Sequence, residues 1–119
     1  MIVDDDPFRF VEDAPLFVVP RTLDALRAFR AAPRLAALHA DERARLGPAI
    51  DAVADRLIAA IAARPTKFWV LKQFQPVLEA VRHDDTEARD HVGTELEELM
   101  EMLGIESSDG VLAYYLGGI

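Results

Sequence analysis

The chain of 119 residues contains no cysteine, which excludes disulfides, zinc–thiolate sites and thiol nucleophiles. A protein without cysteine also fits a reducing compartment. Long apolar runs are missing as well: the longest, residues 57–63, is far too short to span a bilayer, and the opening MIVDDD lacks the basic start of an export signal. We therefore expect a cytoplasmic protein with no membrane segment.

Basic residues are in the minority, 13 lysines and arginines against 21 acidic residues, and the formal net charge is −8. This charge works against nonspecific binding to nucleic acid or to anionic membranes. The sequence also lacks a Walker loop, a dinucleotide-binding glycine motif and an EF-hand, and its only serines, Ser107 and Ser108, have no nucleophile elbow. We predict no catalytic residues and no cofactor, which favours a protein that is not an enzyme.

The amino-acid composition is that of an ordinary globular domain, since 51% of the residues are hydrophobic and 29% are charged. We expect residues 1–119 to form one domain. Residues 1–20 contain three prolines and no helical periodicity, so they predict an extended strap. The rest has apolar residues at helical spacing, and the chain as a whole predicts an all-α fold, a bundle of about five helices with an extended N-terminal strap.

Local signals predict the helix boundaries in the first half of the chain. Thr22 is predicted to cap the first helix, and Pro33 to end it and to open a second helical segment that carries Leu35 and Leu38. The pair Gly47–Pro48 is predicted to close that segment and to start the next helix, because glycine favours the end of a helix and proline its first turn.

The second half of the chain predicts a kinked helix and a long acidic one. Thr66 is a predicted N-cap, and Pro76 removes one hydrogen bond from the helix that follows, which should bend it. The spacing from Asp84 to Glu87 is that of a capping box, and Gly104 is placed to close the helix. One of the two serines is predicted to cap a final short helix.

Charge is unevenly distributed, and this is the most informative surface feature. Residues 21–45 carry six arginines against three acidic residues, whereas residues 84–109 carry ten acidic residues and one arginine. The outward face of the long helix is predicted to be a solvated face, a binding surface for a basic partner, or a surface that meets the arginine-rich helices within the chain or across a dimer. Its carboxylates are Glu87, Asp90, Glu97, Glu98 and Glu101.

Two further patterns have both a functional and a structural interpretation. Glu87, His91 and Glu95 share one edge of the long helix and could bind a divalent metal, but no second helix supplies partner ligands, so we interpret His91 as a surface residue and predict no metal site. Phe68 and Trp69 lie away from the apolar stripe of their helix. The strap or a second helix could cover them, and the alternative makes Trp69 an anchor for a partner.

The segments FWVLKQFQ, DDTEARDH and ELEELMEMLGIESSDG, between Phe68 and Leu112, resemble a family of small bacterial helical proteins known as domain of unknown function forty-eight forty-four. The resemblance implies a helical fold and assigns no activity, so it adds no functional residue.

Three hypotheses about function remain open. The first is a noncatalytic protein-binding module, such as an immunity or inhibitor protein, that binds a basic partner through the five carboxylates above, with Trp69 as a further contact. The second is a small-molecule-binding or metal-assisted helical enzyme that uses Glu87, His91 and Glu95. The third is a structural subunit that forms a homo-oligomer through Trp69 and its charged faces.

Overall fold

The computed structural model describes residues 6–117, and within that range it is all-α, as predicted. Its dimensions are 43 × 37 × 20 Å, so the molecule is flattened. Counting the two halves of one kinked helix together gives the expected five helices. The helices are α1 (Pro20–Ala31), α2 (Ala40–Ala60), α3 (Lys67–Gln73), α4 (Gln75–Val81), α5 (Thr86–Met102) and α6 (Val111–Leu116).

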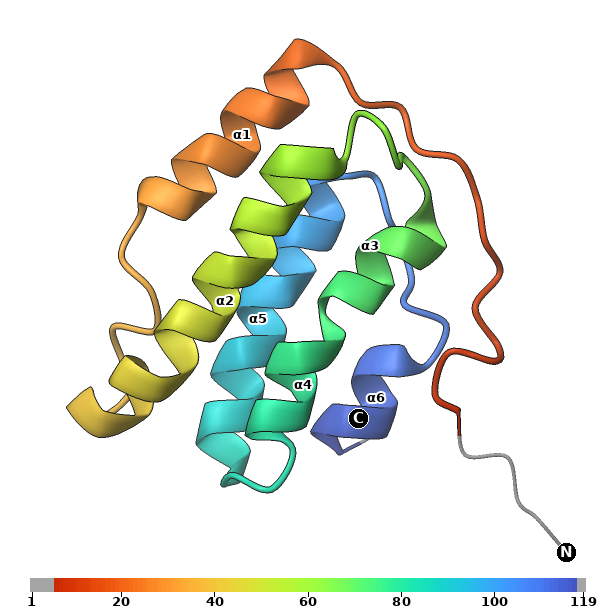
Figure 1. Cartoon of the computed structure of the whole chain (residues 1–119). Helices are drawn as coiled ribbons and strands as arrows, with labels where there is room; N and C mark the ends of the chain where they lie inside the picture. Colours follow the sequence, from red (N-terminus) through yellow and green to blue (C-terminus); the bar gives the residue numbers. More distant parts are fainter. Residues whose placement is uncertain (1–5, 118–119) are drawn as a thin grey trace, which may run out of the picture.

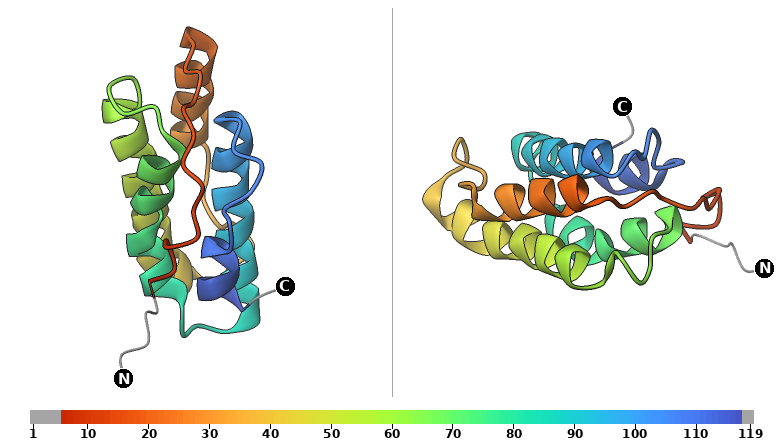
Figure 2. Two further views of the ribbon diagram at one scale, coloured as in Figure 1. Left: turned by 90° about the vertical axis from the view of Figure 1, so that its right-hand side faces the viewer. Right: turned by 90° about the horizontal axis from the view of Figure 1, so that it is seen from above.

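The long helix α2 is central and packs against α1, α3, α4 and α5 (Figure 1). Viewed from the side, α2, α3 and α4 form one side of the molecule and α5 with α6 forms the other, while α1 and the strap run along the seam between them (Figure 2). None of the helices in the described part is both long and apolar enough to cross a membrane.

The predicted apolar stripes form the core. In α2, α3–α4 and α5 the apolar residues at helical spacing are buried, because the apolar stripe of each helix faces the other helices in one common core. The fully buried side chains include Ile50, Val53, Leu57, Val70, Phe74, Val77, Val81, Val92, Leu96 and Leu99.

Three predicted boundaries in the first half are wrong. Helix α1 begins at Pro20 with Val19 as N-cap, and Thr22 lies inside its first turn, where its hydroxyl accepts a hydrogen bond from the Val19 amide at 3.4 Å. The segment after Pro33 is a loop in which Leu35 adopts a positive φ of 55° while its side chain is buried. Burial of Leu35 and Leu38 is therefore retained without a helix.

The third error is the break at Gly47–Pro48, since α2 runs through both residues. Proline at this position removes the hydrogen bond to the carbonyl of Ala44, but Ala44 and Pro48 are both exposed, so water can satisfy that carbonyl. Gly47 is buried against Arg34, whose Cβ would lie 3.9 Å from a Cβ placed at residue 47.

The kink, the N-caps of α3 and α5 and the end of α5 follow the predictions closely. The bend predicted from Pro76 occurs at Phe74, which ends α3 and starts α4. The N-cap of α5 is Asp85, which accepts from the Ala88 amide at 2.9 Å, one residue later than predicted. Gly104 ends α5 with a φ of 75°, and the amide of Ile105 bonds to the Met100 carbonyl at 2.9 Å, which completes a Schellman motif.

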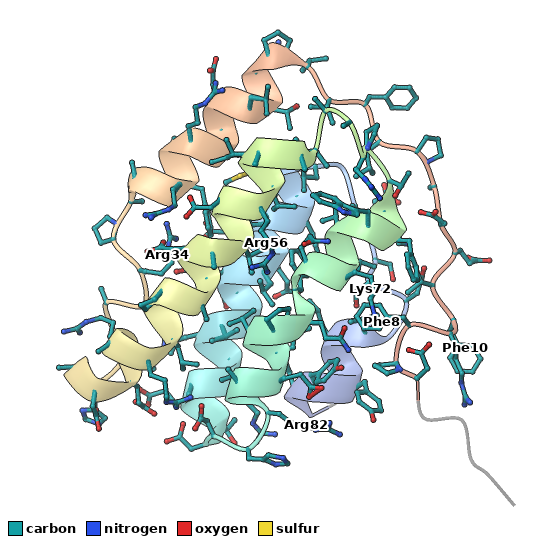
Figure 3. All side chains as sticks on the ribbon, viewed as in Figure 1. Phe8, Phe10, Arg34, Arg56, Lys72 and Arg82 are labelled. Atoms are coloured by element: carbon teal, nitrogen blue, oxygen red, sulfur yellow. The ribbon has the colours of Figure 1, made fainter. Side chains whose placement is uncertain are left out.

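The strap, as far as the structure describes it (residues 6–19), is extended after one turn and is held by backbone contacts. The Leu16 amide donates to the Pro65 carbonyl at 2.6 Å, and the Lys67 amide donates to the Ala14 carbonyl at 2.9 Å. Phe8 is buried, and its ring meets the Phe68 ring edge to face with the two centroids 6.1 Å apart. The Lys72 ammonium lies 4.4 Å from the centroid of the Phe8 ring (Figure 3). The first five residues of the predicted strap lie outside the described range.

Arg34 joins three elements from the loop between α1 and α2. Its side chain is only 7% exposed, and Nη1 lies 3.3 Å from both carboxylate oxygens of Glu95 on α5. The guanidinium also stacks 3.8 Å from the centroid of the Phe29 ring, donates to the Phe29 carbonyl and approaches Asp51 of α2 at 3.6 Å. This buried arginine therefore ties α1, α2 and α5 together (Figure 3).

Candidate partner-binding surface

Helix α5 has three distinct sides. Its apolar stripe faces the core, and Glu95 beside that stripe is occupied by Arg34. The opposite side is solvent-exposed at all five predicted carboxylates, Glu87, Asp90, Glu97, Glu98 and Glu101. The third side faces the C-terminal segment, where α6 packs against α5.

None of these five carboxylates forms an ion pair within residues 6–117. The predicted alternative in which they meet the arginine-rich helices inside the chain is therefore not what the structure shows. The arginines have other partners: Arg30 pairs with Asp51 and Asp55 of α2, and Arg45 pairs with Asp84 at 2.7 Å. The acidic side of α5 is left unneutralised.

The metal-binding interpretation of Glu87, His91 and Glu95 finds no partner ligands. Across the part of the chain that the structure describes, no group of three histidine, cysteine, aspartate or glutamate side chains could hold a metal ion. Glu95 is only 14% exposed and is directed to Arg34, whereas Glu87, two turns earlier on the same helix, is exposed to solvent.

A hollow of about 150 Å³ lies between α5 and α6. Its apolar part is formed by Gly93 of α5 and by Leu112, Ala113 and Leu116 of α6, and its rim carries Arg89, Asp90 and Glu97. Gly93 allows the Leu116 side chain to approach α5 closely, because a Cβ at residue 93 would lie 3.0 Å from Cδ1 of Leu116.

A second hollow continues along the same side of α5 toward its C-terminal end. It is lined by Met100, Gly104 and Ile105 with Glu97, Glu101 and Glu106 around them. Glu97 borders both hollows. At 100° per residue, the α5 residues that line the two hollows, from Arg89 to Glu101, fall within an arc of about 120°, so both hollows open on the same side of the helix, and we refer to them together as the groove.

Helix α6 is held in place by polar contacts of its two tyrosines. The amide of Gln75 donates to the Tyr115 hydroxyl at 3.2 Å, and the Arg82 guanidinium lies 5.1 Å and 5.4 Å from the ring centroids of Tyr114 and Tyr115. Burial raises the pKa of the Tyr115 hydroxyl. These contacts fix the wall of the first hollow relative to α5.

Trp69 is not part of this surface. It lies on α3, half-buried against the core, whereas α5 packs mainly against α1, α2, α4 and α6. Phe68 is 39% exposed and is partly covered by Phe8 of the strap, as one of the sequence interpretations expected. The structure thus brings the five carboxylates together and places Trp69 elsewhere.

The serine region serves to hold the chain together. The Ser108 hydroxyl accepts from the Leu112 amide at 3.2 Å, although the N-cap residue of α6 is Gly110. Asp109 has a φ of 53° and accepts from the Lys67 ammonium at 2.7 Å and from the Glu12 amide at 2.8 Å. Asp109 therefore links the strap, α3 and the segment before α6.

The fold and this surface define the chain as a small helical domain with an acidic, grooved helix as its candidate interaction surface. Residues 21–119 match the family described as Domain of unknown function (DUF4844), and the chain belongs to that family. The match includes the whole of α5 and α6 and leaves out the strap. No curated protein and no solved structure shows a significant similarity to the chain.

Proposed function

We propose that the protein is a noncatalytic protein-binding module that binds a basic protein through the outward face of α5. The observation that supports this proposal is that five exposed carboxylates of one helix have no ion-pair partner among the described residues, whereas Arg30, Arg34 and Arg45 each pair with a carboxylate. Unpaired carboxylates on one face attract a cationic surface over several ångströms and accelerate its association.

The narrower form of this proposal is an immunity or inhibitor protein. Small size, a net charge of −8 and the absence of catalytic motifs suit a protein that works by covering a basic partner. The acidic face of α5, whose carboxylates have no ion-pair partner among the described residues, supports this role as the proposed contact surface.

The test compares two double charge reversals with the same change in net charge. Glu97→Lys with Glu101→Lys removes two carboxylates of the proposed surface, and Glu12→Lys with Glu42→Lys changes two that lie elsewhere and form no ion pair within the described residues. A basic protein is first isolated from native-host lysate at low salt. Its association rate with each variant is then measured by stopped flow.

We expect the α5 reversal to lower the association rate at low salt at least about tenfold and to flatten its salt dependence, because steering of this kind depends on local charge. The control reversal should have a much smaller effect. Equal rates for the two variants would show that the α5 face does not bind the partner.

A further inference from the structure

Beside the carboxylates of α5 lies the groove that the helix forms with the C-terminal segment. Attraction between charges alone does not use this groove in binding. Its floor is made of Leu112, Ala113 and Leu116 in the first hollow and of Met100 and Ile105 in the second. Ala113 is exposed and Leu112 and Leu116 are half-buried, so apolar surface is accessible at the first hollow.

The charges around the groove have one predominant sign. Its lining contains the carboxylates of Asp90, Glu97, Glu101 and Glu106 and a single arginine, Arg89, at one end. The Arg89 Nη2 donates to the Thr86 hydroxyl at 3.3 Å, and Nη1 packs over Gly117 at the end of α6. An occupant must therefore be apolar on one face and cationic beside it.

The dimensions of the groove suit a helix. From Arg89 to Glu101 it follows α5 for about 18 Å, somewhat more than three helical turns. The parts of α5 that line the two hollows are centred near residues 93 and 100, which places them about 10 Å apart, the distance between positions i and i+7 of a helix. A volume of about 150 Å³ is also that of an engineered cavity that takes a benzene ring, so the first hollow has room for one large apolar side chain.

We propose that this groove docks an amphipathic, basic helix of the partner. Two apolar side chains at i and i+7 of that helix enter the two hollows, and lysine or arginine residues on either side pair with the carboxylates of the rim. This inference rests on the proposed function and specifies the element by which the basic partner is recognised.

The probe is an 18-residue peptide of leucine and lysine with leucines at i, i+3, i+4 and i+7. A second peptide has the same composition in an order that distributes the leucines evenly around the helix. Both carry a fluorophore, and their binding to the full chain is measured by fluorescence anisotropy at low and high salt.

The blocking variant is Ala113→Trp, which fills the first hollow from an exposed position on α6. The matched control is Ala59→Trp, a change at an exposed alanine of α2 that lines neither hollow. Circular dichroism establishes that both variants fold.

We expect the amphipathic peptide to bind at least about tenfold more tightly than the permuted one, because only its leucines can be buried together. Ala113→Trp should reduce that binding at least about tenfold, and Ala59→Trp should leave it unchanged. Equal binding of the two peptides, or no effect of Ala113→Trp, would overturn the groove proposal.

These outcomes separate the two proposals. If both peptides bind equally, and if both lose affinity with salt and with Glu97→Lys and Glu101→Lys, the acidic face binds a basic partner without using the groove. If neither peptide binds at low salt, both proposals are overturned.

Discussion

Replacement of Arg34 by alanine should be among the most damaging single changes in this protein. The Arg34 side chain is 7% exposed and contacts the Glu95 carboxylate, the Phe29 ring and the backbone carbonyls of Phe29 and Ala32 at the end of α1. Alanine removes all of these contacts. It also leaves Glu95, which is 14% exposed, as a largely buried carboxylate with no counter-ion.

Breaking a buried ion pair by removing one partner costs about 3–5 kcal/mol. The value for Arg34→Ala should lie near the lower end, about 3 kcal/mol, because Asp51 is 29% exposed and water can replace the arginine there. A loss of this size lowers the melting temperature of a domain of this length by about 10 °C. Arg34→Lys keeps the charge but loses the planar fork and the stacking on Phe29, so it should cost about half as much.

Urea unfolding followed by circular dichroism measures these differences. The control is Arg27→Ala, which removes an arginine of α1 that is 60% exposed and lies 3.6 Å from Asp24, and it should cost less than about 0.5 kcal/mol. A double-mutant cycle with Glu95→Ala should give a coupling of at least about 1 kcal/mol. If Arg34→Ala costs no more than Arg27→Ala, the reasoning about the buried pair is wrong.

Two further predictions concern Asp109 and Gly104. Hydrogen bonding from Lys67 lowers the pKa of the Asp109 carboxyl, so its contribution to stability is present above about pH 4, the unfolded value, and is lost as the pH falls through the lower native pKa. Asp109→Asn should therefore cost about 2 kcal/mol at neutral pH, and the difference from wild type in urea unfolding should shrink below about pH 4; a difference independent of pH would contradict this. Gly104→Ala places a side chain at a φ of 75° and should cost about 1 kcal/mol in the same assay, with Gly104→Asn costing less; equal stability of all three proteins would refute the argument from backbone conformation.

The sequence predicted the buried faces of the helices better than it predicted the helix boundaries. The stripe from Val70 to Val81 is buried as expected, and the helix bends at Phe74, where the ring of Pro76 and its missing amide hydrogen interrupt the helical hydrogen-bond pattern. The pair Gly47–Pro48 misled because a boundary signal depends on solvent: an exposed carbonyl tolerates the loss of its partner. Such exposure is a property of the packed molecule and cannot be recognised in a single sequence.

The candidate surface was predicted only in part, for a similar reason. The exposed carboxylates of α5 follow from the 3.6-residue period, since they lie opposite the apolar stripe. The pairing of Arg34 with Glu95 joins residues 61 positions apart, and no local pattern indicates it. The groove depends on how α6 packs beside Gly93, so its only sequence signal was a glycine in the middle of a helix.

Stability does not explain why the outward face of α5 is acidic. Several charges in α1 and α2 meet opposite charges, as Arg30 does with Asp51 and Asp55, and these charges contribute to packing. Glu97 and Glu101 have no such partner among the described residues, and like charges at i and i+4 weaken a helix by a few tenths of a kcal/mol. Uncharged polar residues would serve the fold at least as well at these positions. The reason for the carboxylates must therefore lie outside the fold, in solubility or in a cationic partner, and only the second makes the association rate depend on where the charge is placed.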